Sequence, residues 1–153
     1  MITLANILLA EDDTADYDFF VDAFSNVCPD AQVTRAINGL NCISILKTSR
    51  HFDIIFLDLN MPGYNGIDCL KHIKSNASLA EIPVIIYSTS HYIKNIDTCY
   101  KQGAHYYIVK PVHVGQLINN LKHVLDQLSN NFDPPDKQRF VVGVSATVED
   151  QGS

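Results

Sequence analysis

Three acids, one hydroxyl and one amine lie at or just after the ends of short apolar runs: Glu11, Asp12, Asp58, Ser88 and Lys110. In an open parallel sheet, ligands bind beyond the carboxyl ends of the strands, so these side chains can meet at one edge. Clustered carboxylates repel one another unless a cation lies among them, and all-oxygen donors suit Mg²⁺. A carboxylate beside a metal ion and a lysine can attack a phosphoryl group. The set therefore indicates a phosphoryl-transfer site with Asp58 as its nucleophile.

Taken one at a time, these residues also have ordinary structural explanations. An acidic pair before a helix can cap that helix, and a serine after a strand is commonly a turn residue. Lys110-Pro111 can belong to a surface loop, and Asp58 can simply end a strand before the turn residues Pro62 and Gly63. Their joint position at strand ends is what favours a functional site.

The elements that must position the five residues alternate along the chain. Short, mostly apolar runs predict strands over 6–10, 32–37, 54–58, 84–88 and 105–109. Apolar residues at helical spacing predict helices after Asp13, from Asn38-Gly39, over 66–75, over 92–102, and along the stripe from Val114 to Leu128. Five strand–helix repeats predict an α/β fold: a doubly wound parallel sheet with helices on both faces.

The alternation ends at Leu128, so residues 1–128 are predicted to form one domain. Residues 129–136 read as a polar, proline-containing linker, and residues 147–153 are predicted to be disordered. The apolar run 140–144 can add to a sheet edge, join a dimer interface, or fray. The 25 residues from 129 to 153 are too few for a second domain.

Composition narrows the class of partner. The net charge of −6 argues against a DNA-binding or anionic-membrane surface, which requires basic patches. The four cysteines show no close pairing, which favours reduced, buried thiols and a cytoplasmic protein. No apolar run approaches the ~18 residues of a membrane span, and no targeting segment is evident.

Four motifs, at residues 8–13, 57–66, 83–88 and 103–111, make the sequence similar to a response-regulator receiver domain of two-component signalling, of the stand-alone chemotaxis kind. The resemblance covers about residues 4–128. It implies a flavodoxin-like (βα)5 fold with strand order 2-1-3-4-5, which is the order found in the chemotaxis receiver itself.

The resemblance also implies roles for individual residues. Asp58 would accept a phosphoryl group from a sensor histidine kinase or phosphotransfer protein. Asp12 would bind Mg²⁺ directly and Glu11 through water, while Asp58 and the backbone carbonyl of Asn60 would complete the protein ligands. Lys110 would contact the phosphoryl group and precede a cis peptide bond to Pro111.

The same resemblance implies a switch. Ser88 would move toward the phosphoryl group, and Tyr107 would rotate inward with it. Serine replaces the threonine that relatives commonly carry, and Thr89 stands where relatives usually have a small residue, so its bulk is expected to hinder access. The expected function is a single-domain regulator that signals through protein contacts to a downstream target, with homodimerisation open, and without turnover of an external substrate.

Three alternative functions each depend on particular residues. A phosphatase of the haloacid-dehalogenase kind also uses a strand-end aspartate, but needs a second acid where Asn60 stands. A flavodoxin-like FMN carrier needs a glycine- and hydroxyl-rich phosphate loop, whereas Glu11 and Asp12 would repel a phosphate. A degenerate receiver would lack the acceptor, the lysine or the acidic pair, and all are present.

Overall fold

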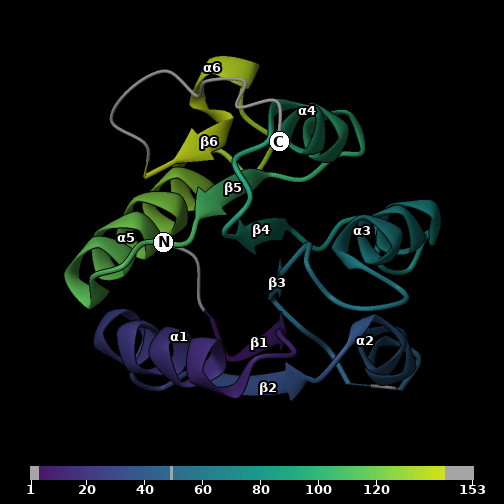
Figure 1. Cartoon of the computed structure of the whole chain (residues 1–153), viewed down its shortest axis with the longest axis horizontal. Helices are drawn as coiled ribbons and strands as arrows, with labels where there is room; N and C mark the ends of the chain where they lie inside the picture. The colour runs from purple at the N-terminus through teal and green to yellow at the C-terminus, as the bar shows by residue number, and fades with distance from the viewer. Residues whose placement is uncertain (1–3, 49, 144–153) are drawn as a thin grey trace.

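The computed structural model describes residues 4–48 and 50–143. Strands and helices alternate through the first ten elements, as the sequence predicts, and two further short elements follow (Figure 1). The elements are β1 Asn6–Ala10, α1 Thr14–Val27, β2 Gln32–Ala36, α2 Gly39–Leu46, β3 Ile54–Leu57, α3 Gly66–Ser75, β4 Val84–Ser88, α4 Ile93–Lys101, β5 Tyr106–Val109, α5 Val114–Asn130, α6 Lys137–Phe140 and β6 Val141–Val142.

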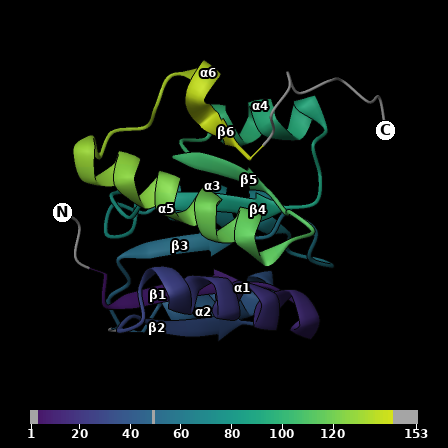
Figure 2. The ribbon, with the colours of Figure 1, turned by 90° about the vertical axis from the view of Figure 1, so that its left-hand side faces the viewer.

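The strands form one parallel sheet in the order β2-β1-β3-β4-β5-β6, seen in Figure 2 from β2 at the bottom upward. The five predicted strands take the predicted order. The prediction of a five-stranded sheet falls one strand short, because β6 pairs with β5. A sheet edge carries unpaired backbone groups, and β6 covers those of β5.

Helices cover both faces of the sheet. In Figure 1, α1 and α5 lie on one face, while α2, α3 and α4 lie on the other. Side chains alternate along each strand, so Phe56 faces the first helical layer and Leu57 the second. Because both faces are buried, strand β3 is apolar along its whole length.

Local sequence explains where the helices next to the strand ends begin. Asp13 caps α1 by accepting a hydrogen bond from the backbone N–H of Asp16 at 2.9 Å. Asn65 and Asp68 form a reciprocal capping box at the start of α3. Gly66 passes against the backbone of Asp58, where a Cβ would lie 2.3 Å from the Asp58 carbonyl oxygen. The close approach therefore requires glycine.

The structure describes the segment after α5 as far as residue 143. Helix α5 continues to Asn130, and the chain then crosses to α6 and β6. The apolar run at 140–144 thus adds to the sheet edge as far as Val142, one of the outcomes the sequence leaves open. Residues 144–153, with the predicted disorder at 147–153, lie outside the described part of the chain.

The sequence also predicts reduced, buried cysteines and no membrane-spanning segment. All four cysteines carry free thiols; Cys42, Cys69 and Cys99 are buried, as predicted, whereas Cys28 is only partly buried. Within residues 4–48 and 50–143, no helix is both long and apolar enough to span a bilayer.

Candidate functional site

The register of the sheet brings the acids together. Strands β1 and β3 are neighbours, and Ala10 is paired with Leu57, so the next residues on each strand are Glu11 and Asp58. The backbone N–H of Asp58 donates to the carbonyl of Ala10 at 3.1 Å, which ties the two strand ends. Both acids therefore emerge side by side at the carboxyl edge of the sheet.

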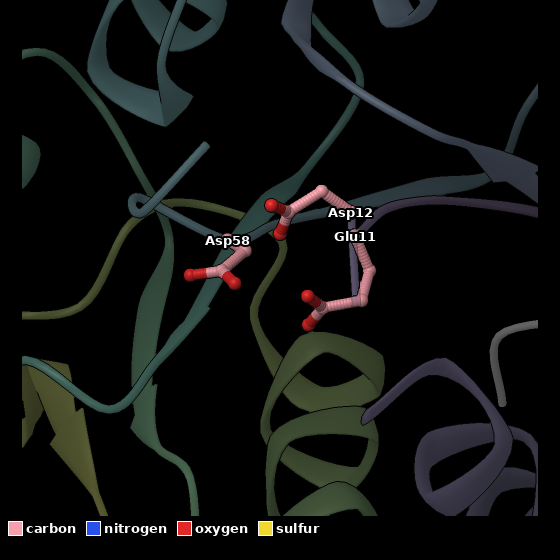
Figure 3. Close-up of side chains that lie close together, drawn as sticks. All are labelled: Glu11, Asp12 and Asp58. Atoms are coloured by element: carbon pink, nitrogen blue, oxygen red, sulfur yellow. The ribbon is translucent and has the colours of Figure 1, made fainter. Parts of the chain in front are cut away.

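The carboxylates of Glu11, Asp12 and Asp58 form one cluster, with one oxygen of each within 4.8 Å of the others (Figure 3). Glu11 and Asp58 are buried, whereas Asp12 is exposed. The predicted acidic site is thus assembled from the predicted residues, with one side open to solvent.

Lys110 is the cation of this site. Its ammonium group donates to Glu11 Oε1 at 2.7 Å, Asp16 Oδ2 at 2.8 Å and Asp58 Oδ2 at 3.0 Å. An ammonium group has three donors, and each has an acidic partner here. Burial acts to lower the pKa of Lys110, but the hydrogen bonds to Asp16 and Glu11 outweigh it and raise the pKa. Lys110 is therefore held as a charged group against Asp58.

The buried position of Glu11 raises the pKa of its carboxyl group. Burial raises the pKa of the Glu11 carboxyl to about 7, the Lys110 hydrogen bond opposes that rise, and the charge on Asp58 adds to it. Carboxylates placed this close favour a bound cation. Three carboxylates provide an all-oxygen donor set that fits Mg²⁺.

Asn60 and Ser88 connect Asp58 to strand β4. The backbone N–H of Asn60 donates to Asp58 Oδ1 at 3.1 Å. The side-chain Nδ2 of Asn60 donates to Ser88 Oγ at 3.3 Å. Ser88 is fully buried, and its hydroxyl oxygen also accepts from the backbone N–H of Ser90 at 3.2 Å. The amide of Asn60 lies 3.4 Å from the hydroxyl of Thr89, which is exposed at the mouth of the site.

Tyr107 lies fully buried on β5, and its hydroxyl donates to the carbonyl of Ser90 at 2.6 Å. Burial raises the pKa of Tyr107, while hydrogen bonding with Ser90 and Ser88 opposes the rise. The side chain of Tyr107 thus points inward in this structure, next to Ser90 in the loop after β4. Its rotation stays a prediction.

One expectation from the resemblance is wrong: the Lys110-Pro111 peptide bond is trans, not cis. The trans form of a bond to proline is lower in energy by about 0.5–1 kcal/mol. With the trans bond, Lys110 already reaches the carboxylates of Glu11, Asp16 and Asp58.

Two residues of the site were missed at the level of sequence. Asp16, in the first turn of α1, is the third partner of Lys110. Arg35, near the end of β2, donates to the carbonyls of Glu11 and Asp12 at 3.0 Å each and so holds the acidic loop. The signal for Arg35 was its place near the end of the strand beside β1. The signal for Asp16 was its place one turn into the helix that Asp13 caps.

The fold and the site together define a class: a flavodoxin-like parallel α/β domain whose strand ends carry buried acids and a lysine. The sequence model of the response regulator receiver domain matches residues 7–122 of this chain. The chain belongs to the response regulator receiver domain family.

Curated relatives agree with this assignment. The chain is 33% identical over 93 residues to two-component response regulator ORR3 of Oryza sativa subsp. indica, covering 59% of this chain and 71% of the relative. It is 29% identical over 133 residues to two-component response regulator-like APRR9 of Arabidopsis thaliana, covering 86% of this chain but only 28% of the relative.

Solved structures of similar fold include the phosphorylated cyanobacterial phytochrome response regulator RcpA, with a TM-score of 0.74 and 28% identity over 85% of this chain and 96% of that one. The Mn²⁺-bound form of response regulator Rcp1 gives a TM-score of 0.73 and 26% identity, covering 86% of this chain and 99% of the other.

Proposed function

We propose that the protein is phosphorylated on Asp58 by a sensor histidine kinase or a phosphotransfer protein, and that the phosphorylated form acts through protein contacts. One observation carries the proposal: Asp58 is 3% exposed, bonded to Lys110, and clustered with Glu11 and Asp12 at the carboxyl edge of the sheet. A buried strand end has no structural need for three acids and a lysine. The same set suits an aspartate nucleophile.

The donor set fits Mg²⁺, which prefers a few carboxylates and retains waters. Asp12 and Asp58 would hold the ion directly, Glu11 would hold it through water, and the backbone carbonyl of Asn60 would add a further oxygen. When bound, the ion would offset the negative charge on the phosphoryl oxygens. That a similar protein, Rcp1, has a Mn²⁺-bound structure supports a divalent cation at this place.

The chain's own residues account for the transfer. A carboxylate oxygen of Asp58 forms a bond to phosphorus, and the bond from phosphorus to the donor's histidine nitrogen breaks, with its electron pair returning to the imidazole. Lys110 then donates to a phosphoryl oxygen in place of the Asp58 oxygen it now contacts. Asn60 connects Ser88 to Asp58 and to the loop between β3 and α3, which we call the acceptor loop (residues 58–65). Ser88 then turns its hydroxyl toward the phosphoryl group.

The switch follows from the same contacts. Movement of Ser88 changes the space beside Ser90 and Tyr107, so Tyr107 becomes more firmly fixed in its inward position. The local charge change on Asp58 thereby biases a two-state element. Receiver-domain response regulators are signalling proteins. We infer that this protein likewise turns over no external substrate.

The proposal also covers the domain boundaries, the location and the partners of the protein. Residues 1–128 are taken as the receiver unit and residues 129–153 as its tail. We further propose that the protein acts in the cytoplasm on a downstream protein target, as a monomer or a homodimer, without direct DNA contact. The phosphatase alternative finds no support, because Asn60 offers an amide that donates to Ser88 and no carboxyl proton.

Incubation with Mg²⁺ and acetyl phosphate, followed by intact mass spectrometry, tests the proposal. Wild-type protein should gain one phosphoryl group, and Asp58→Asn should gain none. Asp53→Asn is the matched control, because Asp53 precedes the other end of β3 and binds the backbone N–H groups of Ala5 and Asn6. An unmodified wild type, or equal labelling of Asp58→Asn, would overturn the proposal.

A further inference from the structure

The segment after α5 returns across the molecule instead of leaving it. Residues 131–136 lead from α5 to α6, which lies next to α4 at the β5 end of the sheet in both views, and β6 then pairs with β5 (Figures 1 and 2). We call residues 131–142 the return segment. It covers the part of the surface where α4 meets β5.

Phe140 is the apolar anchor of the return segment. Its side chain is fully buried and belongs to the same core cluster as Tyr107 and Ile96. Its ring lies 5.1 Å from the ring of Tyr100 and 6.1 Å from the ring of Tyr107, both edge-on. Aromatic pairs of this geometry contribute beyond their buried area.

Polar contacts tie the part of the return segment that precedes this anchor. Lys137 forms an ion pair with Asp97 of α4 at 2.5 Å, and the hydroxyl of Tyr100 donates to the carbonyl of Pro135 at 3.2 Å. Farther back, a ring nitrogen of His105 lies 3.1 Å from the carbonyl of Phe132. The segment is therefore attached along its length and not through Phe140 alone.

The pairing of β6 falls on the switch residue. Val141 is paired with Tyr107 and Val142 with Ile108. Tyr107 thus has the return segment against both its backbone and its ring. In the other direction, its hydroxyl bonds Ser90, whose N–H bonds Ser88, whose hydroxyl accepts from Asn60 next to the acceptor. A continuous series of contacts joins Asp58 to Phe140.

We propose that the return segment is an intramolecular positioning element for the switch: Phe140 holds Tyr107 inward, so docking of this segment and phosphorylation of Asp58 favour one another. The inference rests on the proposed function of Asp58. A tyrosine that swings out from β5 on this face would meet the space that Phe140 fills, so only the inward position is compatible with the docked segment. A segment that packs on one position of a switch must favour it, and the coupling is reciprocal.

The first test uses the protein without Mg²⁺ or phosphoryl donor, so that it stands apart from the proposed function. With 3-fluorotyrosine incorporated, the fluorine resonance of Tyr107 is identified as the one lost in Tyr107→Phe. Phe140→Ala should move this resonance toward the shift of an exposed tyrosine, and Phe140→Leu should largely restore it. Leu40→Ala is the control, because Leu40 is an exposed apolar residue on α2, outside the return segment. An unchanged Tyr107 resonance in Phe140→Ala overturns the proposal.

The second test measures coupling with beryllium fluoride, a phosphoryl mimic, in the presence of Mg²⁺. Phe140→Ala should weaken the apparent affinity for the mimic about fivefold or more, the lower end of ordinary coupling, while Leu40→Ala should not. In wild-type protein the mimic should slow amide hydrogen exchange at Val141 and Val142 by a similar factor. Equal affinity in the two variants, or exchange that does not respond, overturns the proposal. A wild type that binds no mimic would instead defeat the proposed function of Asp58.

Because Phe140 is fully buried, a second variant guards against misfolding. Lys137→Gln removes the partly exposed ion pair with Asp97 and leaves the core intact. It should weaken the mimic's affinity in the same direction by about twofold, as suits an exposed pair. If Phe140→Ala loses its cooperative unfolding transition, Lys137→Gln decides the matter, and an unchanged affinity overturns the coupling.

Discussion

The ammonium group of Lys110 lies 3.0 Å from Oδ2 of Asp58, although 52 residues separate them in the chain. Strand β4 lies between β3, which precedes Asp58, and β5, which precedes Lys110, so the lysine side chain must reach across it. Its ammonium also lies 5.2 Å from the ring centre of Tyr87 on that strand. The charge of Lys110 therefore links the carboxyl end of β5 to the carboxyl end of β3.

Removal of this charge should destabilise the fold. Lys110→Ala leaves the buried Glu11 and Asp58 without their shared cation, and breaking a buried pair in this way costs about 3 kcal/mol. We expect the free energy of unfolding in urea, without Mg²⁺, to fall by about that amount. Lys101→Ala, at an exposed position on α4, should change it by less than about 0.5 kcal/mol. Similar losses in both variants would contradict the role given to Lys110.

A pair of glycine substitutions should have opposite effects. In Gly66→Ala the added methyl would lie 2.3 Å from the Asp58 carbonyl oxygen, so the acceptor loop must move at a cost of about 2 kcal/mol in unfolding free energy. Gly115→Ala places its methyl in open space in the first turn of α5 and should stabilise by about 0.5 kcal/mol. Thermal unfolding measures both. Phosphorylation by acetyl phosphate should slow only in Gly66→Ala, and a normal rate there would contradict the requirement for glycine.

Much of the site was predictable because its signals are local. An apolar run that ends in an acid and a turn marks the end of a strand, and strand–helix alternation makes the sheet parallel. Those two facts are enough to bring Glu11, Asp12, Asp58, Ser88 and Lys110 to one edge. No knowledge of side-chain conformation is needed for that step.

The missing parts depend on distances that a sequence does not contain. Asp16 reaches Lys110 across 94 residues, and this depends on the length of the lysine and the tilt of α1. Strand β6 has only two residues, too few for a periodic signal. Its place is decided by the burial of Phe140 against Tyr100 and Tyr107.

Thr89 gives a kinetic prediction. Its side chain is exposed and lies beside Asn60, so it narrows the approach to the acceptor loop. Thr89→Ala should speed phosphorylation by acetyl phosphate about threefold, which corresponds to a barrier lower by about 0.65 kcal/mol. Stopped-flow or timed mass spectrometry would measure the rate. Thr98→Ala on α4, whose hydroxyl bonds the carbonyl of Lys94, serves as the control. An unchanged or slower rate in Thr89→Ala would show that its bulk does not limit access.

His105 predicts how stability depends on pH. The side chain is 5% exposed, one ring nitrogen contacts the carbonyl of Phe132, and Nδ1 has no partner within the described chain. Burial lowers the pKa of His105 to about 4, with the charge of Lys74 acting in the same direction and that of Asp133 against it. Since an unfolded histidine titrates near 6.5, the unfolded chain binds more protons between these two values.

Stability contributed by His105 should therefore be complete above pH 6.5 and should be lost as the pH falls toward about 4, by up to about 1.4 kcal/mol per pH unit. Urea unfolding of wild-type protein and His105→Gln from pH 5 to 8 would measure the difference. Glutamine keeps a neutral donor for the Phe132 carbonyl and takes up no proton, so its stability should fall less on acidification. His123→Gln, at an exposed position on α5, should retain the wild-type slope. If His105→Gln and wild type lose stability in parallel, protonation of His105 does not set the acid limit of the fold.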